Sequence, residues 1–123
     1  MPRVLTDQDF NEDIIRGLAR RVADLDWMPL RRAGNIRSRD AEVLRIALAD
    51  DRILLSHDAK TLHPLALRLI AEGSPVPRVV VVPKVMAWRI AIDELELLLL
   101  AGTERDWGVG VVRLPLPSTL IPR

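Results

Sequence analysis

The chain contains no cysteine and very few aromatic residues. Among its 123 residues there is no cysteine or tyrosine, one phenylalanine and three tryptophans. The absence of cysteine excludes disulfides and every thiolate zinc site, and it fits a reducing, cytoplasmic location. Trp27, Trp88 and Trp107 are scattered along the chain, whereas proteins that bind single-stranded nucleic acid gather aromatic side chains on one surface. We therefore interpret the tryptophans as packing residues.

Long apolar runs and an excess of charge of one sign are also missing. The longest apolar run, residues 97–101, is too short to span a bilayer, and Asp7, Asp9 and Glu12 interrupt the first 20 residues, so neither a membrane segment nor a secretory signal is expected. The chain has 18 basic and 17 acidic residues, a net charge of +1, which argues against a histone-like binder. Any RNA contact must come from a local patch.

Arginines are concentrated in the first third of the chain, where they could form such a patch. They are Arg16, Arg20, Arg21, Arg31, Arg32, Arg37 and Arg39. Taken alone, the simpler interpretation is a solvated arginine-rich surface.

The apolar residues alternate between strand-like and helix-like patterns. Strands are predicted at residues 3–6, 24–30, 52–56, 78–82 and 108–114, and helices at 11–22, 40–50, 60–72 and 85–101. This order predicts one α/β domain over residues 1–123, a three-layer α/β/α sandwich with a mostly parallel central sheet. Residues 31–38 are expected to form a loop, and 115–123 an extended C-terminal tail. The leucine run 97–100 covers more than one helical face, so a homodimer surface competes with core packing.

Three aspartates occupy positions where a ligand site is expected. Asp7 follows the first strand, Asp58 comes two residues after the third, and Asp40 opens a helix. The carboxyl ends of parallel strands are where ligands collect in open α/β sheets. Converging carboxylates suit Mg²⁺ or Mn²⁺, which polarise a phosphoryl oxygen and lower the pKa of bound water. The pattern predicts a metal-dependent nuclease with Asp7 and Asp58 as principal ligands and Asp40 completing the set.

Helix capping is the competing interpretation of these carboxylates. Asp7, Asp9, Asp40 and Asp58 all precede predicted helices, and aspartate is a preferred N-cap residue. For Asp9 we favour the cap. For Asp40, expected at an N-cap, and for Asp58, capping and metal binding both remain open.

The remaining motifs point away from other enzyme classes. His57 could act as a base or ligand, but a lone histidine at a strand end more often packs beside or supports such carboxylates, and we favour that interpretation. No zinc-binding pattern surrounds His57 or His63, so a zinc hydrolase is not expected. Gly108-Val109-Gly110 is followed by a strand and not by a helix, which excludes a dinucleotide cradle.

The segments around the three aspartates resemble the DUF5615 family of PIN-like proteins, relatives of VapC-type toxin ribonucleases. The likeness covers residues 3 to about 116. It is carried by Leu5-Thr6-Asp7-Gln8-Asp9-Phe10-Asn11, Arg16-Gly17-Leu18, Arg39-Asp40-Ala41-Glu42-Val43-Leu44, Arg52-Ile53-Leu54-Leu55-Ser56-His57-Asp58 and Arg113-Leu114-Pro115-Leu116. The resemblance implies a PIN-like sandwich and a magnesium- or manganese-dependent endoribonuclease site, with Asp7, Asp40 and Asp58 as catalytic and metal-binding residues. It also implies a toxin role with a cognate antitoxin.

The chain departs from the family pattern at two positions beside the expected site. Gln8 and Lys60 stand where many members of the family have acidic residues. A glutamine brings no charge and a lysine repels a second cation, so one metal ion is expected. Lys60 is either a phosphate contact or a solvated residue at a helix start. A related family pattern, Thr-His-Asp, appears in this chain as Ser56-His57-Asp58, which preserves a hydroxyl group at the first position.

Three functional hypotheses follow from the sequence. The first is a metal-dependent ribonuclease, with Gln8, Asp9, Ser56, His57 and Lys60 supporting the carboxylates or contacting substrate. The second is a catalytically reduced PIN-like module that binds a partner. The third and weakest is a phosphoacceptor domain that would use Asp7 and Lys84.

Overall fold

A five-stranded sheet, parallel throughout, forms the centre of the molecule. In the computed structural model, which describes residues 1–33 and 39–117, the strand order is β2-β1-β3-β4-β5. Every neighbouring pair of strands is parallel. The strands are β1 (Arg3–Thr6), β2 (Asp26–Pro29), β3 (Ile53–Ser56), β4 (Val79–Val81) and β5 (Val111–Arg113).

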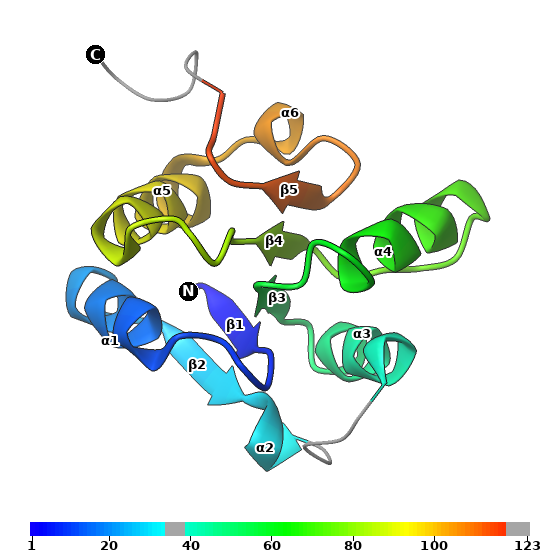
Figure 1. Ribbon diagram of the computed structural model, residues 1–123, viewed down its shortest axis with the longest axis horizontal. Helices are drawn as coiled ribbons and strands as arrows, with labels where there is room; N and C mark the ends of the chain where they lie inside the picture. The colour runs from blue at the N-terminus through cyan, green and yellow to red at the C-terminus, as the bar shows by residue number, and fades with distance from the viewer. Residues whose placement is uncertain (34–38, 118–123) are drawn as a thin grey trace.

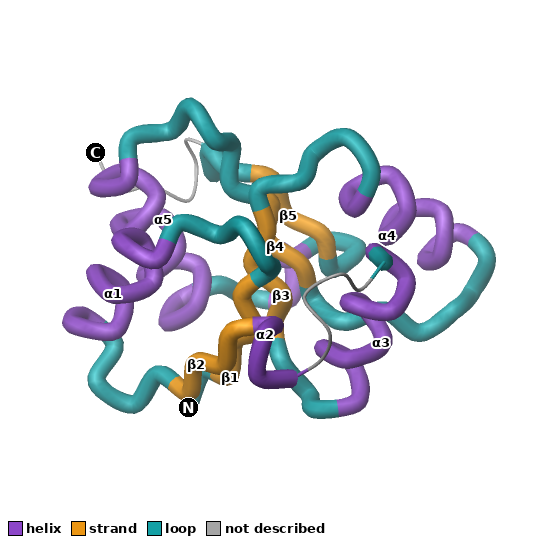
Figure 2. The backbone as a smooth tube through the Cα atoms, turned by 60° about the horizontal axis from the view of Figure 1, so that its bottom comes forward, coloured by secondary structure: helices purple, strands orange, loops and turns teal. Residues whose placement is uncertain are grey.

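Helices cover both faces of this sheet (Figure 1). They are α1 (Glu12–Arg21), α2 (Leu30–Ala33), α3 (Asp40–Ala49), α4 (Leu62–Ala71), α5 (Trp88–Ala101) and α6 (Glu104–Trp107). In Figure 1 the pair α1 and α5 lies on one side of the sheet and the pair α3 and α4 on the other, and Figure 2 shows the same separation. The predicted three-layer α/β/α sandwich with a parallel sheet is confirmed.

The core consists of two apolar layers, one on each face of the sheet. Val4, Leu55 and Val80 pack with α1 and α5. Their strand neighbours Leu5 and Leu54 pack with α3 and α4. Side chains alternate between the two faces along a strand, so strands buried on both sides are apolar at nearly every position. This explains the run of four consecutive valines at 79–82, all of which are completely buried.

Several predicted elements differ from the observed ones. The helix expected from residue 85 begins at Trp88, because the Met86 N–H donates to the Pro83 carbonyl at 3.1 Å and closes a turn first. Part of the loop expected at 31–38 belongs to α2, and residues 34–38 lie outside the described ranges. The short helix α6 was not predicted, although Thr103 and Asp106 form a capping box at its start.

Two predicted helix caps were wrong. The N-cap of α1 is Asn11, whose side chain accepts the Asp13 N–H at 2.8 Å, and not Asp9. The N-cap of α3 is Arg39, which makes no side-chain capping bond, and Asp40 is the first residue of that helix. The carboxylate of Asp40 is therefore available for contacts outside its own helix.

The turn that leads into the last strand uses the conformational freedom of glycine. Gly108 has φ 56° and Gly110 has φ 105°, a region that residues with a side chain rarely adopt. The predicted strand 108–114 is therefore shortened to β5.

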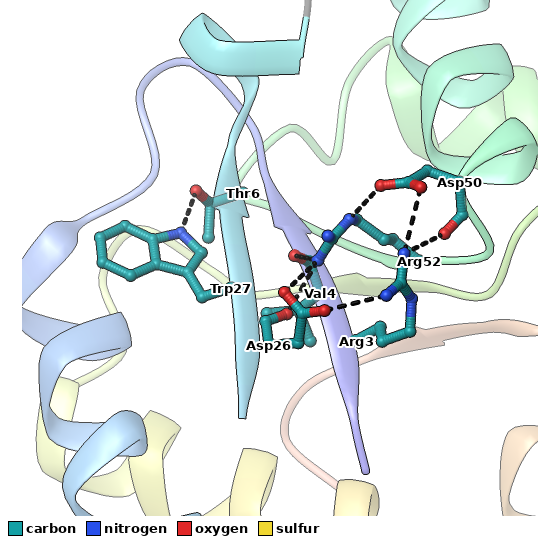
Figure 3. Close-up of polar contacts among 7 residues, drawn as sticks. All are labelled: Arg3, Val4, Thr6, Asp26, Trp27, Asp50 and Arg52. Atoms are coloured by element: carbon teal, nitrogen blue, oxygen red, sulfur yellow. Dashed lines mark hydrogen bonds and ion pairs between the residues drawn. The ribbon is translucent and has the colours of Figure 1, made fainter. Parts of the chain in front are cut away.

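A cluster of charged side chains lies at the amino-terminal edge of the sheet (Figure 3). The guanidinium of Arg52, whose side chain is 5% exposed, donates to Asp26 Oδ1 at 3.0 Å, Asp50 Oδ2 at 2.5 Å and the Asp26 carbonyl at 2.9 Å. Arg3 donates to Asp26 Oδ2 at 2.9 Å and to Asp50 Oδ1 at 3.1 Å. We call these four residues the arginine cluster. It ties the beginnings of β1, β2 and β3 to the end of α3.

The chain after β5 continues against the body of the protein. Leu116 is buried, and its N–H donates to Glu94 Oε1 of α5 at 2.5 Å. The rest of the predicted tail, residues 118–123, lies outside the described ranges. Within those ranges, no helix combines the length and the apolar character that crossing a bilayer requires.

Candidate functional site

The structure places Asp7 and Asp58 at the same edge of the sheet. Strands β1 and β3 are parallel neighbours in which Thr6 pairs with Leu55. The Asp7 N–H donates to the Leu55 carbonyl at 3.0 Å, so the strand pairing continues into the first aspartate. Because Asp58 follows β3 by two residues, both carboxylates stand at the carboxyl ends of adjacent strands.

A buried serine connects these two positions. Ser56, which is fully buried, donates its hydroxyl hydrogen to Asp7 Oδ2 at 2.8 Å. The hydroxyl oxygen of Ser56 in turn accepts the Asp58 N–H at 3.0 Å. The other oxygen of Asp7 accepts the Gln8 N–H at 2.8 Å. One hydroxyl therefore fixes how the carboxylate of Asp7 lies relative to the loop that carries Asp58.

A threonine connects Asp58 to the third predicted residue. The hydroxyl oxygen of Thr61 lies 2.5 Å from Asp58 Oδ2 and 2.6 Å from Asp40 Oδ2. A hydroxyl carries one hydrogen and can donate to one of these oxygens at a time. Two carboxylate oxygens thus share a single donor. Such an arrangement favours a positive charge between Asp40 and Asp58.

The environment of Asp58 stabilises its ionised form. Burial, the largest single effect, acts to raise the pKa of this carboxyl group, but hydrogen bonds from the Thr61 hydroxyl and the amides of Thr61, Lys60 and Leu62 together outweigh it and lower the pKa below its ordinary value. The hydrogen bonds that Asp58 Oδ1 accepts from the amides of Lys60 and Thr61 measure 2.9 Å and 2.8 Å. Donors that bind the charged form are the expected cause of such a shift.

His57 is held by main-chain groups on both sides of its ring. Its Nε2 accepts the Asn11 N–H at 3.1 Å, so the proton must be on Nδ1, which donates to the Val82 carbonyl at 2.8 Å. The ring of Phe10 stacks on it at 4.5 Å between centroids. Since both nitrogens are engaged, this geometry supports a packing role that joins the β1–α1 loop to the end of β4.

These residues line an open cleft of about 580 Å³. Its acidic side carries Asp7, Asp9, Asp40 and Asp58, with Gln8 beside them. Its basic residues are Lys60, two residues after Asp58, Lys84, which follows β4, and Arg113 at the end of β5. Thr61 and Arg113 were not predicted as site residues. Asp7 was predicted because it is a polar residue at the carboxyl end of a parallel strand, and the same reasoning applies to Arg113.

The carboxylates do not by themselves form a closed metal cage. Among residues 1–33 and 39–117, no three acidic or histidine side chains lie close enough together to coordinate one ion. Hydroxyl groups stand between the carboxylates instead. The donor set of three carboxylates and two hydroxyls is nevertheless entirely oxygen, which matches the preference of Mg²⁺ and Mn²⁺.

Comparisons of this chain with models of known protein families, with curated proteins and with solved structures found no match. By its fold the protein is an α/β/α sandwich with a parallel sheet. The carboxyl edge of that sheet forms a cleft that is lined by acidic and basic residues.

Proposed function

We propose that this protein is a metal-dependent endoribonuclease that hydrolyses RNA phosphodiesters in the cleft at the carboxyl edge of its sheet. The observation that carries the proposal is the linked set of three aspartates. They come from the end of β1, the start of α3 and the loop after β3, and Ser56 and Thr61 connect them. The resemblance of the same segments to PIN-like ribonucleases supports this assignment.

The cluster of Asp7, Asp40 and Asp58 would hold one Mg²⁺ or Mn²⁺ ion through one or two of its carboxylates at a time, with water and substrate phosphate as the remaining ligands. The bound ion supplies Lewis acidity toward a phosphoryl oxygen and a water of lowered pKa. The protein contributes positioning: Ser56 orients Asp7, and the donors around Asp58 keep it ionised. A single ion is favoured because Gln8 is uncharged and Lys60 adds a positive charge to the same cleft.

The resemblance further suggests that the ribonuclease is the toxin of a toxin–antitoxin pair. An antitoxin would then inhibit the enzyme by covering the cleft. We expect expression of the wild-type chain to arrest cell growth and expression of Asp7→Asn to leave growth unchanged. Equal growth with the two chains at equal expression would argue against the toxin role.

The alternative is a binding module that has kept the fold without catalysis. It is favoured by the fact that the carboxylates already have donors within the chain. Asp58 accepts hydrogen bonds from one hydroxyl and several amides, and Asp7 from Ser56 and Gln8. Cation binding separates the two functions, because an interaction module does not require it.

The deciding experiment is RNA cleavage by the purified protein with Mn²⁺, with Mg²⁺ and with chelator. The variants are Asp7→Asn and Asp58→Asn, and the matched control is Asp24→Asn, an exposed aspartate that contacts the N-terminal amine at 3.9 Å. Folding of each variant is checked by circular dichroism. Cleavage that needs the cation, persists in the control and is lost in both site variants supports the nuclease. No cleavage of a broad RNA panel, with no cation binding by calorimetry, favours the interaction module.

A further inference from the structure

Two basic residues of the cleft, Lys84 and Arg113, have no role in the proposed cation site. Lys60, Lys84 and Arg113 line the cleft, and the last two are exposed residues near the ends of β4 and β5. In the part of the chain that the structure describes, none of the three forms an ion pair, whereas several other arginines do. Their charge is therefore available to an anionic ligand that enters the cleft.

The sheet fixes where Arg113 lies relative to the carboxylates. Ser56 pairs with Val81, and Val81 pairs with Arg113, so the three residues form one row across β3, β4 and β5. Paired residues of a parallel sheet direct their side chains to the same face. Adjacent strands are about 4.8 Å apart, which places the backbone of Arg113 roughly 10 Å from that of Ser56. Lys84 follows β4, the strand between them.

The charges across the cleft favour one direction for a bound polyanion. A phosphate on the acidic side depends on a cation to offset the charges of Asp7, Asp40 and Asp58. The neighbouring phosphates of the same strand find positive charge toward β4 and β5, where Lys84 and Arg113 stand. An acidic peptide shares the charge but lacks the phosphoryl oxygens that Mg²⁺ sites commonly bind.

We propose that Lys84 and Arg113 form a phosphate subsite that binds the backbone of a single RNA strand beside the cleavage position. A separation of roughly 10 Å places this subsite within a few nucleotides of the cleavage position. The location of the cleavage position rests on the proposed function, but the subsite itself requires only RNA binding. Lys84 and Arg113 are positioning residues and take no part in the chemical step.

The first test measures the affinity of the intact protein for a short single-stranded RNA at several salt concentrations. Ca²⁺, another hard cation with oxygen ligands, replaces Mn²⁺, and the RNA is checked for integrity after each titration. Lys84→Met and Arg113→Met should each reduce the slope of log K against log salt by about 0.7. The charge-preserving Lys84→Arg should keep the wild-type slope. So should Arg105→Met, which changes an exposed arginine of α6 outside the cleft.

The second test locates the contacted phosphate. RNAs that carry one neutral methylphosphonate linkage at successive positions are titrated against the wild type and Arg113→Met. We expect one position, within a few nucleotides of the cleavage position, at which the neutral linkage weakens wild-type binding but not binding by the variant. A competing oligoglutamate peptide tests whether the subsite accepts any polyanion.

The outcomes separate this proposal from the proposed nuclease. RNA binding that depends on Lys84 and Arg113, without cleavage, supports the subsite and refutes the nuclease. Cleavage with unchanged salt slopes in both variants supports the nuclease and overturns the subsite. The subsite is also overturned if the RNA does not bind, if Arg105→Met has the same effect, or if oligoglutamate displaces the RNA through the same two residues.

Discussion

Replacement of Arg52 by methionine should destabilise the fold by about 3 kcal/mol. The side chain of Arg52 is 5% exposed and donates to two carboxylates and two main-chain carbonyls. Removing one partner of a buried ion pair costs about 3–5 kcal/mol, because the remaining charge loses its compensation. The lower figure applies here because Asp26 and Asp50 are 31% and 47% exposed and both keep Arg3 as a partner. Methionine fills most of the volume of the lost side chain, which separates the electrostatic effect from a cavity.

The assay is urea unfolding followed by tryptophan fluorescence. We expect a lower midpoint with an unchanged m-value, and a fall in Tm of about 10 °C, given that about 1 kcal/mol corresponds to several degrees in a domain of this size. The control is Arg68→Met, which removes an exposed pair with Glu72 at 3.8 Å and should cost less than about 0.5 kcal/mol. A loss below about 1 kcal/mol for Arg52→Met, similar to the control, would refute the reasoning.

Three further predictions concern the opposite edge of the sheet. Thr61→Val should weaken Mn²⁺ binding by about tenfold or more in calorimetry, and Thr61→Ser should restore it; equal affinities would show that the shared hydroxyl does not position Asp40 and Asp58. Ser56→Ala should lower the free energy of unfolding by about 1–3 kcal/mol, because Asp7 Oδ2 loses its buried donor; an unchanged urea midpoint would contradict this. The pKa of Asp58 is lower in the folded protein, so its stabilising effect is complete above the unfolded value of about 3.9 and is lost as the pH falls through the folded value. In urea unfolding at a series of pH values, Asp58→Asn should therefore lose less stability than the wild type as the pH falls through this range. Identical pH profiles of the free energy of unfolding would contradict a lowered pKa of Asp58.

The sequence contained enough information to predict the layers and the position of two of the aspartates. An alternation of strands and helices favours a parallel sheet, so Asp7 and Asp58 were expected at one edge. The contact of Thr61 with Asp40 could not be predicted in this way, because it depends on how α3 and α4 pack. The charge of Arg52 at the start of an apolar strand was a signal for a buried ion pair that the sequence reasoning did not use.

Local signals also explain some errors in the predicted boundaries. Thr103-x-x-Asp106 is a capping pattern, and it starts a helix where none was expected. The cap predicted at Asp9 lies instead at Asn11, a residue type that is favoured equally at this position. Trp27, interpreted as a packing residue, lies against the core, and its indole N–H donates to the Thr6 hydroxyl at 2.9 Å (Figure 3).

The arginine cluster also has a consequence for the specificity of strand pairing. A short apolar strand such as β3 can pair with a neighbour in several alignments that bury similar areas, and a slip of one residue would turn Ser56 away from Asp7. Arg52 immediately precedes β3 and binds the Val4 carbonyl of the adjacent strand β1 and Asp26 of β2, the strand beyond it. A slipped alignment would leave this buried charge unpaired. The cluster thereby selects the one alignment in which Ser56 and Asp7 meet, about 13 Å away at the other end of the strand.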